Sequence, residues 1–385
     1  SGVVLLAVAA FILFPGTGPW HIIVAGGIIL QLLVFTGVRM RLQPLFKSVQ
    51  QLRNVAAGLS EVCDLMAQEE WSDSYLLKLH NTLKVAQNGM HSLRRLSIPV
   101  ALRNHGILGF VLNGLVLWDV HTANYVAKHI AMVEPSFDEG FAAVARLEAL
   151  VSLTTPCFTR SVVCWPDLST EPEPHIRGKD VQHLLIPEPH AVGNDITLST
   201  GVDVITGSNM SGKTTLLRTV GTNLVLAYAG APLPARSFHT TKMHIFTSMR
   251  VGNSIGRGES TFYAELKRIR GMIEFSRLDQ PFIALIDEIF KGTNSADRIV
   301  GAKATLRHLA DSRGIVMVST HDFELCDLAT DPAVAATNHH FVESYPDGRL
   351  YFDYKMRPGR CQTTNARYLL RMAGILDEEG KDEKS

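Results

Sequence analysis

Residues 207–214 read Gly-Ser-Asn-Met-Ser-Gly-Lys-Thr, and this spacing of glycine, lysine and hydroxyl residues is typical of a phosphate-binding loop. The backbone N–H groups of such a loop and the N-terminus of the next helix hold phosphate oxygens, because both present unpaired donors and partial positive charge. Lys213 would reach the β- and γ-phosphates, and the Thr214 hydroxyl would bind Mg²⁺. The predicted nucleotide-binding residues are Gly207, Ser208, Asn209, Met210, Ser211, Gly212, Lys213, Thr214 and Thr215.

Polar residues also follow two apolar runs further along the chain. The run 282–286 ends in Asp287 and Glu288, and the run 315–319 is followed by Thr320 and His321. At the end of a buried strand, Asp287 would support Mg²⁺, usually through a metal-bound water, and Glu288 would orient or deprotonate the attacking water. His321 could hydrogen-bond the γ-phosphate. Phosphoryl transfer needs positioning and charge compensation more than covalent chemistry, so these parts make a nearly complete catalytic site.

Ser260 lies in the glycine-bearing segment 256–262, just ahead of a predicted helix. A serine at a helix N-terminus is a ready ligand for a γ-phosphate. Lys213, Thr214 and His321 already fill the site of their own subunit, so Ser260 points to service in trans, over the nucleotide of a neighbouring subunit. An ordinary helix N-cap remains the alternative for this serine.

Strands that alternate with helices would position these residues. The apolar strand 282–286 has the character of a parallel strand buried on both faces. The alternation predicts an α/β fold, a mostly parallel sheet flanked by helices. The expected strands are 196–198, 202–206, 243–249, 282–286 and 315–319, the expected helices are 214–229, 261–275 and 299–309, and 340–344 with 350–354 form an antiparallel edge.

Only helices are predicted from residue 44 to about 155. Apolar residues recur at helical spacing through this part of the chain. The longest expected helices are 107–131 and 137–153, the second capped near Ser136. Its histidines show no metal-ligand spacing, so we interpret this part as an all-α packing or lever domain without a catalytic site.

Apolar residues dominate the first part of the sequence. Residues 3–14 form one apolar run, 15–19 contain two prolines, and residues 20–38 form a second run. The second run is about long enough to cross a hydrocarbon core of ~30 Å. We predict a transmembrane helical hairpin, with a buried core hairpin as the alternative, and we expect further residues ahead of Ser1. The basic residues after the second run place the rest of the chain in the cytoplasm, at an inner or plasma membrane.

The chain of 385 residues is long enough for two or three domains. Its 37 basic and 37 acidic residues cancel, which gives no general electrostatic case for binding nucleic acid. Its five cysteines contain no C-x-x-C pair and are expected to be reduced thiols. The predicted organisation is a transmembrane hairpin (1–43), a helical core or lever domain (44–155), an ATPase domain (156–376) and a charged tail (377–385).

Four sequence blocks resemble the ATPase domain of the MutS family, within the ABC class of ATPases. In chain order they are GSNMSGKTTLLRTVGTNLVLAYAGAPLPA, GRGESTFYAELKRI, IALIDEIFKGTNSADR and STHDFEL. The resemblance runs from about residue 183 to 374, and residues 44–155 are more loosely similar to the helical core and lever of that family. It implies a Mg²⁺-dependent ATPase whose nucleotide state moves the lever.

The resemblance also assigns roles to further residues. It implies that Asn209 contacts phosphates and that Ser260 is the signature serine acting in trans, in a homodimer with composite ATP sites. It places Asn294 and Ser295 in a loop facing the partner subunit, and the ring of Tyr354 over adenine.

Two features depart from the family pattern. No Phe-x-Glu motif stands ahead of the helical region, where apolar segments occur instead, and the helical region is short for a DNA clamp. The chain looks most like the membrane-anchored MutS-related proteins, and DNA binding or mismatch repair rests on the resemblance alone. An ABC-transporter ATPase is an alternative, although GRGESTF differs from the transporter signature LSGGQ. A nucleotide-gated membrane scaffold is the second alternative function.

Overall fold

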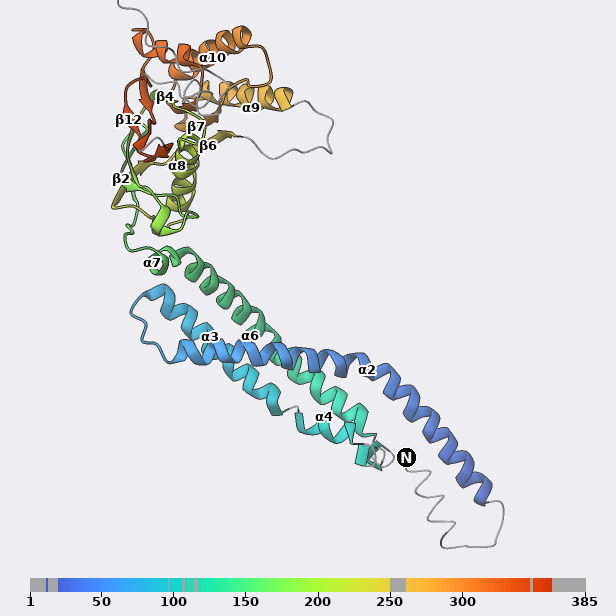
Figure 1. Cartoon of the computed structure of the whole chain (residues 1–385). Coiled ribbons are helices and arrows are strands. Elements are labelled where there is room, and N and C mark those ends of the chain that lie inside the picture. The colour runs from blue at the N-terminus through green and yellow to red at the C-terminus, as the bar shows by residue number, and fades with distance from the viewer. Residues whose placement is uncertain are drawn as a thin grey trace, which may run out of the picture. The chain divides into compact units, whose positions relative to one another are not determined.

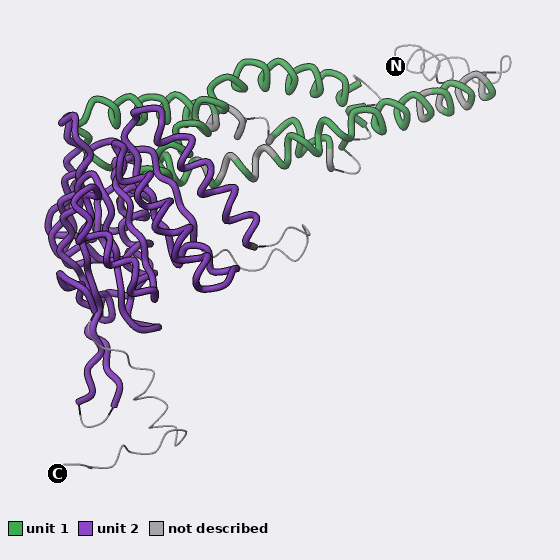
Figure 2. The backbone as a smooth tube through the Cα atoms, turned by 90° about the horizontal axis from the view of Figure 1, so that it is seen from above, with its two compact units in different colours: residues 1–151 green, residues 152–385 purple. Residues whose placement is uncertain are grey.

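The computed structural model describes residues 12, 20–95, 97–105, 108–109, 111–113, 117–249, 261–346 and 349–361. The chain divides into two compact units, residues 1–151 and 152–385, which Figure 2 colours separately. Each unit is considered by itself below.

The first unit is helical, as predicted. Its main helices are α2 (Trp20–Ala67), α3 (Ser74–Arg95), α4 (Ser97–Asn104) and α6 (Trp118–Thr154). Helices α2 and α3 lie side by side (Figure 1). Buried side chains from all four helices form one apolar core, which includes Phe46, Met66, Leu79, Leu83, Val100, Val126 and Phe137.

Helix α6 corrects the prediction of two separate helices with a break near Ser136. It runs from Trp118 to Thr154 with Pro135 inside it. The residues buried on either side of the proline, Val133 and Phe137, belong to the same core, so burial of a continuous face outweighs the hydrogen bond that proline removes. Within α6, Phe141 is 41% exposed, whereas Ala143 is buried.

The first arm of the predicted hairpin, residues 3–14, lies outside the described residues apart from Ile12. The second arm lies in α2, which begins at Trp20 and continues without interruption to Ala67. Among the described residues, the helical stretch Trp118–Thr159 has the length and composition to cross a membrane, and an 18-residue window within it has a mean hydropathy of 1.3. This stretch contains α6, whose apolar residues also contribute to the helical core.

The second unit contains the predicted mostly parallel sheet. Its six strands lie in the order β12-β9-β4-β8-β7-β6, and only β12 is antiparallel to its neighbour. The strands are β4 (Gly201–Thr206), β6 (His244–Ser248), β7 (Phe282–Asp287), β8 (Gly314–Ser319), β9 (Ala336–His340) and β12 (Arg357–Pro358). The central strands β4 and β8 are buried at every position. In β4 this includes Asp203, whose Oδ1 lies 2.9 Å from His339 Nε2.

Helices cover both faces of this sheet. They are α8 (Lys213–Tyr228), α9 (Thr261–Ser276) and α10 (Ser295–Ala310), with a 3₁₀ helix η2 (Phe323–Thr330). Helix α10 begins four residues before the predicted start because Asn294 caps it by accepting a hydrogen bond from the Asp297 N–H. The short hairpin of β10 (Glu343–Ser344) and β11 (Tyr351–Phe352) matches the predicted antiparallel edge.

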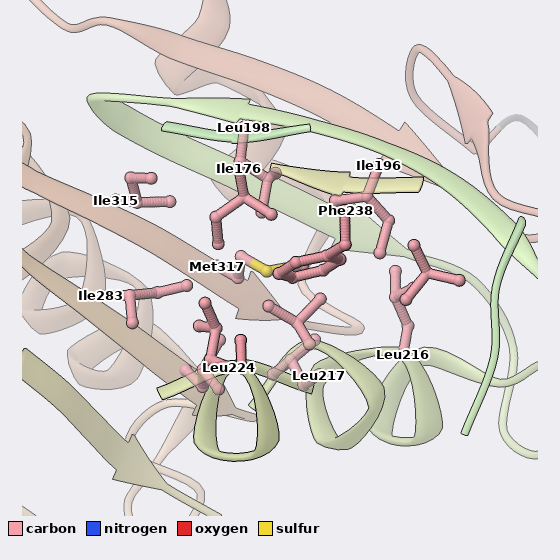
Figure 3. Packing of buried hydrophobic residues seen from close by; sticks show 14 of the residues in the cluster. Ile176, Ile196, Leu198, Leu216, Leu217, Leu224, Phe238, Ile283, Ile315 and Met317 are labelled. Atoms are coloured by element: carbon pink, nitrogen blue, oxygen red, sulfur yellow. The ribbon is translucent and has the colours of Figure 1, made fainter. Parts of the chain in front are cut away.

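A second, four-stranded sheet was not predicted. It has the order β1-β5-β2-β3, with β1 (Asp167–Ser169), β2 (His175–Val181), β3 (Asn194–Ser199) and β5 (Ser237–Thr241). Figure 3 shows the core where this sheet, α8 and the larger sheet meet. Leu216, Leu217 and Leu224 of α8 face Ile176, Ile196, Leu198 and Phe238 of the smaller sheet and Ile283, Ile315 and Met317 of the larger one. This packing fixes the first turn of α8, and therefore the phosphate loop.

Candidate nucleotide site

The predicted phosphate loop joins the buried strand β4 to α8. Gly207 follows β4 with a φ of +145°, and a Cβ there would lie 2.9 Å from Ser211 Oγ and 3.0 Å from the Phe341 carbonyl oxygen. Gly212 precedes α8 with a φ of +110°. Both positions need glycine, because side chains rarely adopt these φ values and the first position also lacks space. The strand, loop and helix that the motif requires are therefore present.

The Lys213 ammonium lies within the loop. Its Nζ donates to the carbonyl oxygens of Gly207 at 2.8 Å and Ser208 at 2.7 Å. The residue is 6% exposed, and burial lowers the pKa of its ammonium to about 8. Asp287 and Glu288 oppose this shift of the pKa, since their charges favour the cation. A phosphate oxygen in the loop would compete for the protons that Lys213 gives to these carbonyls.

Asp287 lies directly across from the first turn of α8. The Thr214 hydroxyl is 2.9 Å from Asp287 Oδ1 and 3.0 Å from Oδ2, and the Ser319 hydroxyl also donates to Oδ1. Parallel pairing of β7 with β8 sets Asp287 opposite Ser319, which explains the second contact. The sequence interpretation missed Ser319, although its place at the end of a buried strand was a usable signal.

Glu288 turns away from Asp287 because its backbone adopts a φ of +59°. Its N–H donates to the Ser319 carbonyl oxygen at 3.0 Å. Its carboxylate pairs with His321 Nε2, 3.0 Å from Oε1, and with Lys291. The hydrogen bond from His321, with a smaller contribution from Lys291, lowers the pKa of Glu288 to about 2. Glu288 is therefore a carboxylate at neutral pH, and its two partners hold the oxygens that would contact a water.

A cavity of about 670 Å³ opens over the phosphate loop. Besides loop residues 209–215, its lining includes Glu288, His321 and Tyr354. Tyr354 is 43% exposed, and a Cβ at Gly212 would lie 3.3 Å from its Cδ1. The lining also contains a wall formed by the β2–β3 connection, which the sequence interpretation did not assign to the site: His183, Ile186, Pro189, His190 and Val192.

Asn194 ties this wall to the segment that carries Tyr354. Its Nδ2 donates to the Tyr354 carbonyl oxygen at 3.0 Å, and its Oδ1 accepts from the Met356 N–H at 2.7 Å. A second link, also missed, is the buried Glu343, whose Oε2 accepts a hydrogen bond from Ser208 Oγ at 3.0 Å. Both contacts join residues more than a hundred positions apart, so no local pattern could have revealed them.

The structure brings together most of the predicted site. Lys213, Thr214, Asp287, Glu288 and His321 meet at the carboxyl ends of β4, β7 and β8, and Tyr354 lines the same cavity. Ser260 lies outside the described residues. Among the described residues, no group of three or more His, Cys, Asp or Glu side chains could hold a metal. A Mg²⁺ ion held by one hydroxyl, one carboxylate and substrate phosphates needs no such cluster.

The fold and this site define an α/β domain with a phosphate loop on a mostly parallel sheet. Residues 203–378 match the family model of MutS domain V, an ATPase domain. Residues 203–378 are therefore related to MutS domain V, and the match covers somewhat less than half of the chain.

Three curated relatives show the extent of the similarity. The DNA mismatch repair protein MutS of Natronomonas pharaonis is 28% identical over 256 residues, which cover 65% of this chain and 29% of that protein. MutS of a Synechococcus species is 31% identical over 255 residues, or 64% of this chain and 28% of that protein. DNA mismatch repair protein MutS 2 of Haloarcula marismortui is 32% identical over 176 residues, or 45% and 18%. The chain thus spans less than a third of the length of each.

Proposed function

We propose that this protein is a Mg²⁺-dependent ATPase that works as a membrane-anchored dimer. The observation that carries the proposal is the convergence of Lys213, Thr214, Asp287, Glu288 and His321 beside one cavity. These side chains come from separate segments of the chain, and each supplies a different requirement of phosphoryl transfer.

Thr214 and Asp287 would hold the metal ion. Their oxygens already lie within hydrogen-bond distance of each other, and both are hard donors of the kind that Mg²⁺ takes alongside phosphate oxygens. When bound, Mg²⁺ would neutralise charge on the phosphates. Lys213 would supply a second positive charge from within the loop.

Glu288 would orient the attacking water or accept its proton. In the structure His321 and Lys291 occupy its carboxylate. A γ-phosphate that attracts His321 would release one carboxylate oxygen toward the water. The water oxygen would then bond to the γ-phosphorus as the bond to the β–γ bridging oxygen breaks, which yields ADP and inorganic phosphate. The cavity wall with Tyr354 and His190 would accept the base.

A dimer would complete two such sites. In this proposal, which rests on the family resemblance, Ser260 reaches the γ-phosphate of the other subunit. Asn294 and Ser295, at the start of α10, face that subunit. Nucleotide-driven opening and closing of the dimer would move the helical lever.

Residues 3–38 would anchor the protein in a membrane. In support, Ile22, Ile29, Leu30 and Leu33 of α2 each expose more than half of their side chains. Contact with lipid is favourable for such apolar side chains, whereas contact with water is not. Flotation of the full chain with lipid vesicles, retained in high salt and lost after Leu30→Lys and Leu33→Lys, tests the anchor. Recovery of the unmodified protein in the soluble fraction would contradict it.

A role in DNA repair is a separate hypothesis. The relatives are named DNA mismatch repair proteins, and their chains extend far beyond the region shared with this one. A transporter ATPase or a nucleotide-gated scaffold would use the same nucleotide site. The response of ATP turnover to DNA distinguishes the repair hypothesis from the transporter and scaffold hypotheses.

The test is ATP turnover by the full chain in detergent, with and without duplex, mismatched or branched DNA. Glu288→Gln should lower kcat about 100-fold or more while ATP still binds, because only the proton acceptor changes. Lys213→Ala should lose both binding and turnover. A salt-dependent stimulation by DNA would favour the repair role. No turnover at concentrations that enforce dimers would overturn the ATPase.

A further inference from the structure

Arg298 holds Asp322 in a two-pronged ion pair beside the nucleotide site. Arg298 lies in the first turns of α10, and Asp322 lies between β8 and η2. Arg298 Nε is 2.8 Å from Asp322 Oδ2, and Nη2 is 2.7 Å from Oδ1. The two side chains are 24% and 18% exposed. A guanidinium fork on a carboxylate fixes orientation as well as distance, which a single ammonium cannot do.

Asp322 is the residue after His321, so the pair acts on the turn that carries the histidine. On the strand side, the Thr320 N–H donates to the Ile205 carbonyl oxygen at 3.0 Å. On the other side, the Asp322 N–H donates to Thr320 Oγ1 at 2.9 Å. The backbone of the turn is therefore held against β4, and the Asp322 carboxylate connects the turn to α10.

The side chain of His321 is not buried, so surrounding side chains do not enclose its ring. It is 39% exposed, and its Nε2 lies 3.0 Å from Glu288 Oε1. The position of its ring therefore depends on the turn beneath it. The hydrogen bonds to Asp322 raise the pKa of the Arg298 guanidinium, and the negative charge of Glu288 adds a smaller contribution.

We propose that Arg298 is a positioning residue for hydrolysis: by holding Asp322 it fixes the turn that sets His321 against Glu288. This inference rests on the ATP hydrolysis proposed above. Arg298 itself does not contact the reacting groups, and it acts through the geometry of the His321–Glu288 pair.

The same two elements offer a matched control. Helix α10 and η2 are also joined by Arg307 and Asp331, whose Nη2 and Oδ2 are 3.1 Å apart. That pair lies more than two helical turns further along α10, away from the site, and Arg307 is 52% exposed. Loss of either arginine weakens the contact between α10 and η2, but only Arg298 holds the residue next to His321.

The experiment compares the full chain with its Arg298→Ala, Arg298→Lys and Arg307→Ala variants. Arg298→Ala should lower kcat about 10- to 100-fold, as small displacements of catalytic groups do, with little change in the KM for MgATP. Arg298→Lys should fall in between, since an ammonium cannot form the fork. Arg307→Ala should match the unmodified protein. Exchange of the charges in Arg298→Asp with Asp322→Arg should recover part of the rate.

Three outcomes would overturn the inference. One is equal kcat in Arg298→Ala and Arg307→Ala. Another is a fall in the affinity for a fluorescent ATP analogue without a fall in kcat, which would indicate a binding role. The third is full activity of Arg298→Lys. This variant also tests the inference if Arg298→Ala does not fold. Absence of turnover by the unmodified protein would instead overturn the proposed ATPase activity. That result differs from the three outcomes above, which all require an active unmodified protein.

Discussion

The Thr214 hydroxyl lies between the two carboxylate oxygens of Asp287, 2.9 Å from one and 3.0 Å from the other. The hydroxyl comes from the first turn of α8, and the carboxylate comes from the end of β7. A bifurcated contact of this kind brings together the two oxygen donors that a Mg²⁺–nucleotide complex needs. It also means that the metal ion would replace an existing hydrogen bond rather than fill a space between distant groups.

Thr214→Val removes this hydroxyl with little change of shape. We expect kcat to fall about 100-fold and the Mg²⁺ concentration for half-maximal activity to rise, because one metal ligand is lost. The loss of the hydrogen bond should cost only about 1 kcal/mol of the free energy of unfolding. A Mg²⁺ titration of ATP turnover measures the effect.

Thr330→Val is the control for this change, since it removes an exposed hydroxyl of η2 that donates to the Asp327 carbonyl oxygen. Its Mg²⁺ titration should follow that of the unmodified protein. If the Thr214→Val titration does so too, Thr214 is not a metal ligand.

The close approach of Gly207 to Ser211 and Phe341 makes a different prediction. Gly207→Ala should abolish nucleotide binding, because the new Cβ would push Ser211 or the Phe341 backbone and deform the loop. The strained φ alone costs of order 1–3 kcal/mol of stability. Equilibrium binding of a fluorescent ATP analogue measures the loss.

A control substitution at Gly230 separates the effect of backbone strain from the effect of steric crowding at Gly207. Its φ is +75°, and a Cβ there would meet nothing within 4 Å. Gly230→Ala should therefore lower stability by about 1 kcal/mol and leave nucleotide binding intact. Equal binding by the two alanine variants would show that the approach of Gly207 to its neighbours has no role in the site.

Glu265 of α9 supports the loop that follows Glu288. Its Oε1 accepts the Phe290 N–H at 2.5 Å, where Phe290 has a φ of +57°. Glu265→Ala would leave this half-buried N–H without its acceptor, at a cost of about 1–3 kcal/mol of the free energy of unfolding. We also expect kcat to fall about tenfold, as loss of support displaces Glu288.

Glu274→Ala on the same helix provides the comparison. Glu274 is 56% exposed and pairs with Arg270, so its loss should change stability by no more than about 0.5 kcal/mol. Thermal unfolding and ATP turnover of both variants are the measurements. A Glu265→Ala variant as stable and active as Glu274→Ala would contradict the supporting role.

The sequence revealed the parts of the site that are local in the chain. The phosphate loop, the Asp287–Glu288 pair and His321 each follow an apolar strand, and parallel strands bring their carboxyl ends to one edge. The chemistry of these residue types could therefore be predicted together with their position.

What could not be predicted depends on pairing over long distances. Strand β2 contains Arg177, Lys179 and Asp180, so its apolar alternation is weak. Its partner β5 lies beyond the phosphate loop and α8 in the chain. The cavity wall formed by the β2–β3 connection was missed for the same reason. Likewise, only the fold shows that Asn194 contacts Tyr354, or that Arg298 pairs with Asp322.

His183, on that wall, predicts a pH dependence of stability. The Leu185 N–H donates to its Nδ1 at 3.2 Å, which requires this nitrogen to be unprotonated. Burial, followed by the charges of Arg218 and Arg160, lowers the pKa of the His183 imidazole. The unfolded chain, with an ordinary histidine pKa near 6.5, therefore takes up a proton at a higher pH than the folded chain does.

Because the unfolded state binds this proton first, the stability that neutral His183 contributes is present above pH ~6.5 and is lost as the pH falls through the lowered pKa. His183→Gln cannot titrate in this range. As the pH falls from about 7.5 to 5.5, we expect the free energy of unfolding of the unmodified protein to decrease relative to that of His183→Gln. Urea unfolding of both proteins at several pH values measures it, and a difference that stays constant with pH would show that burial of His183 is not linked to protonation.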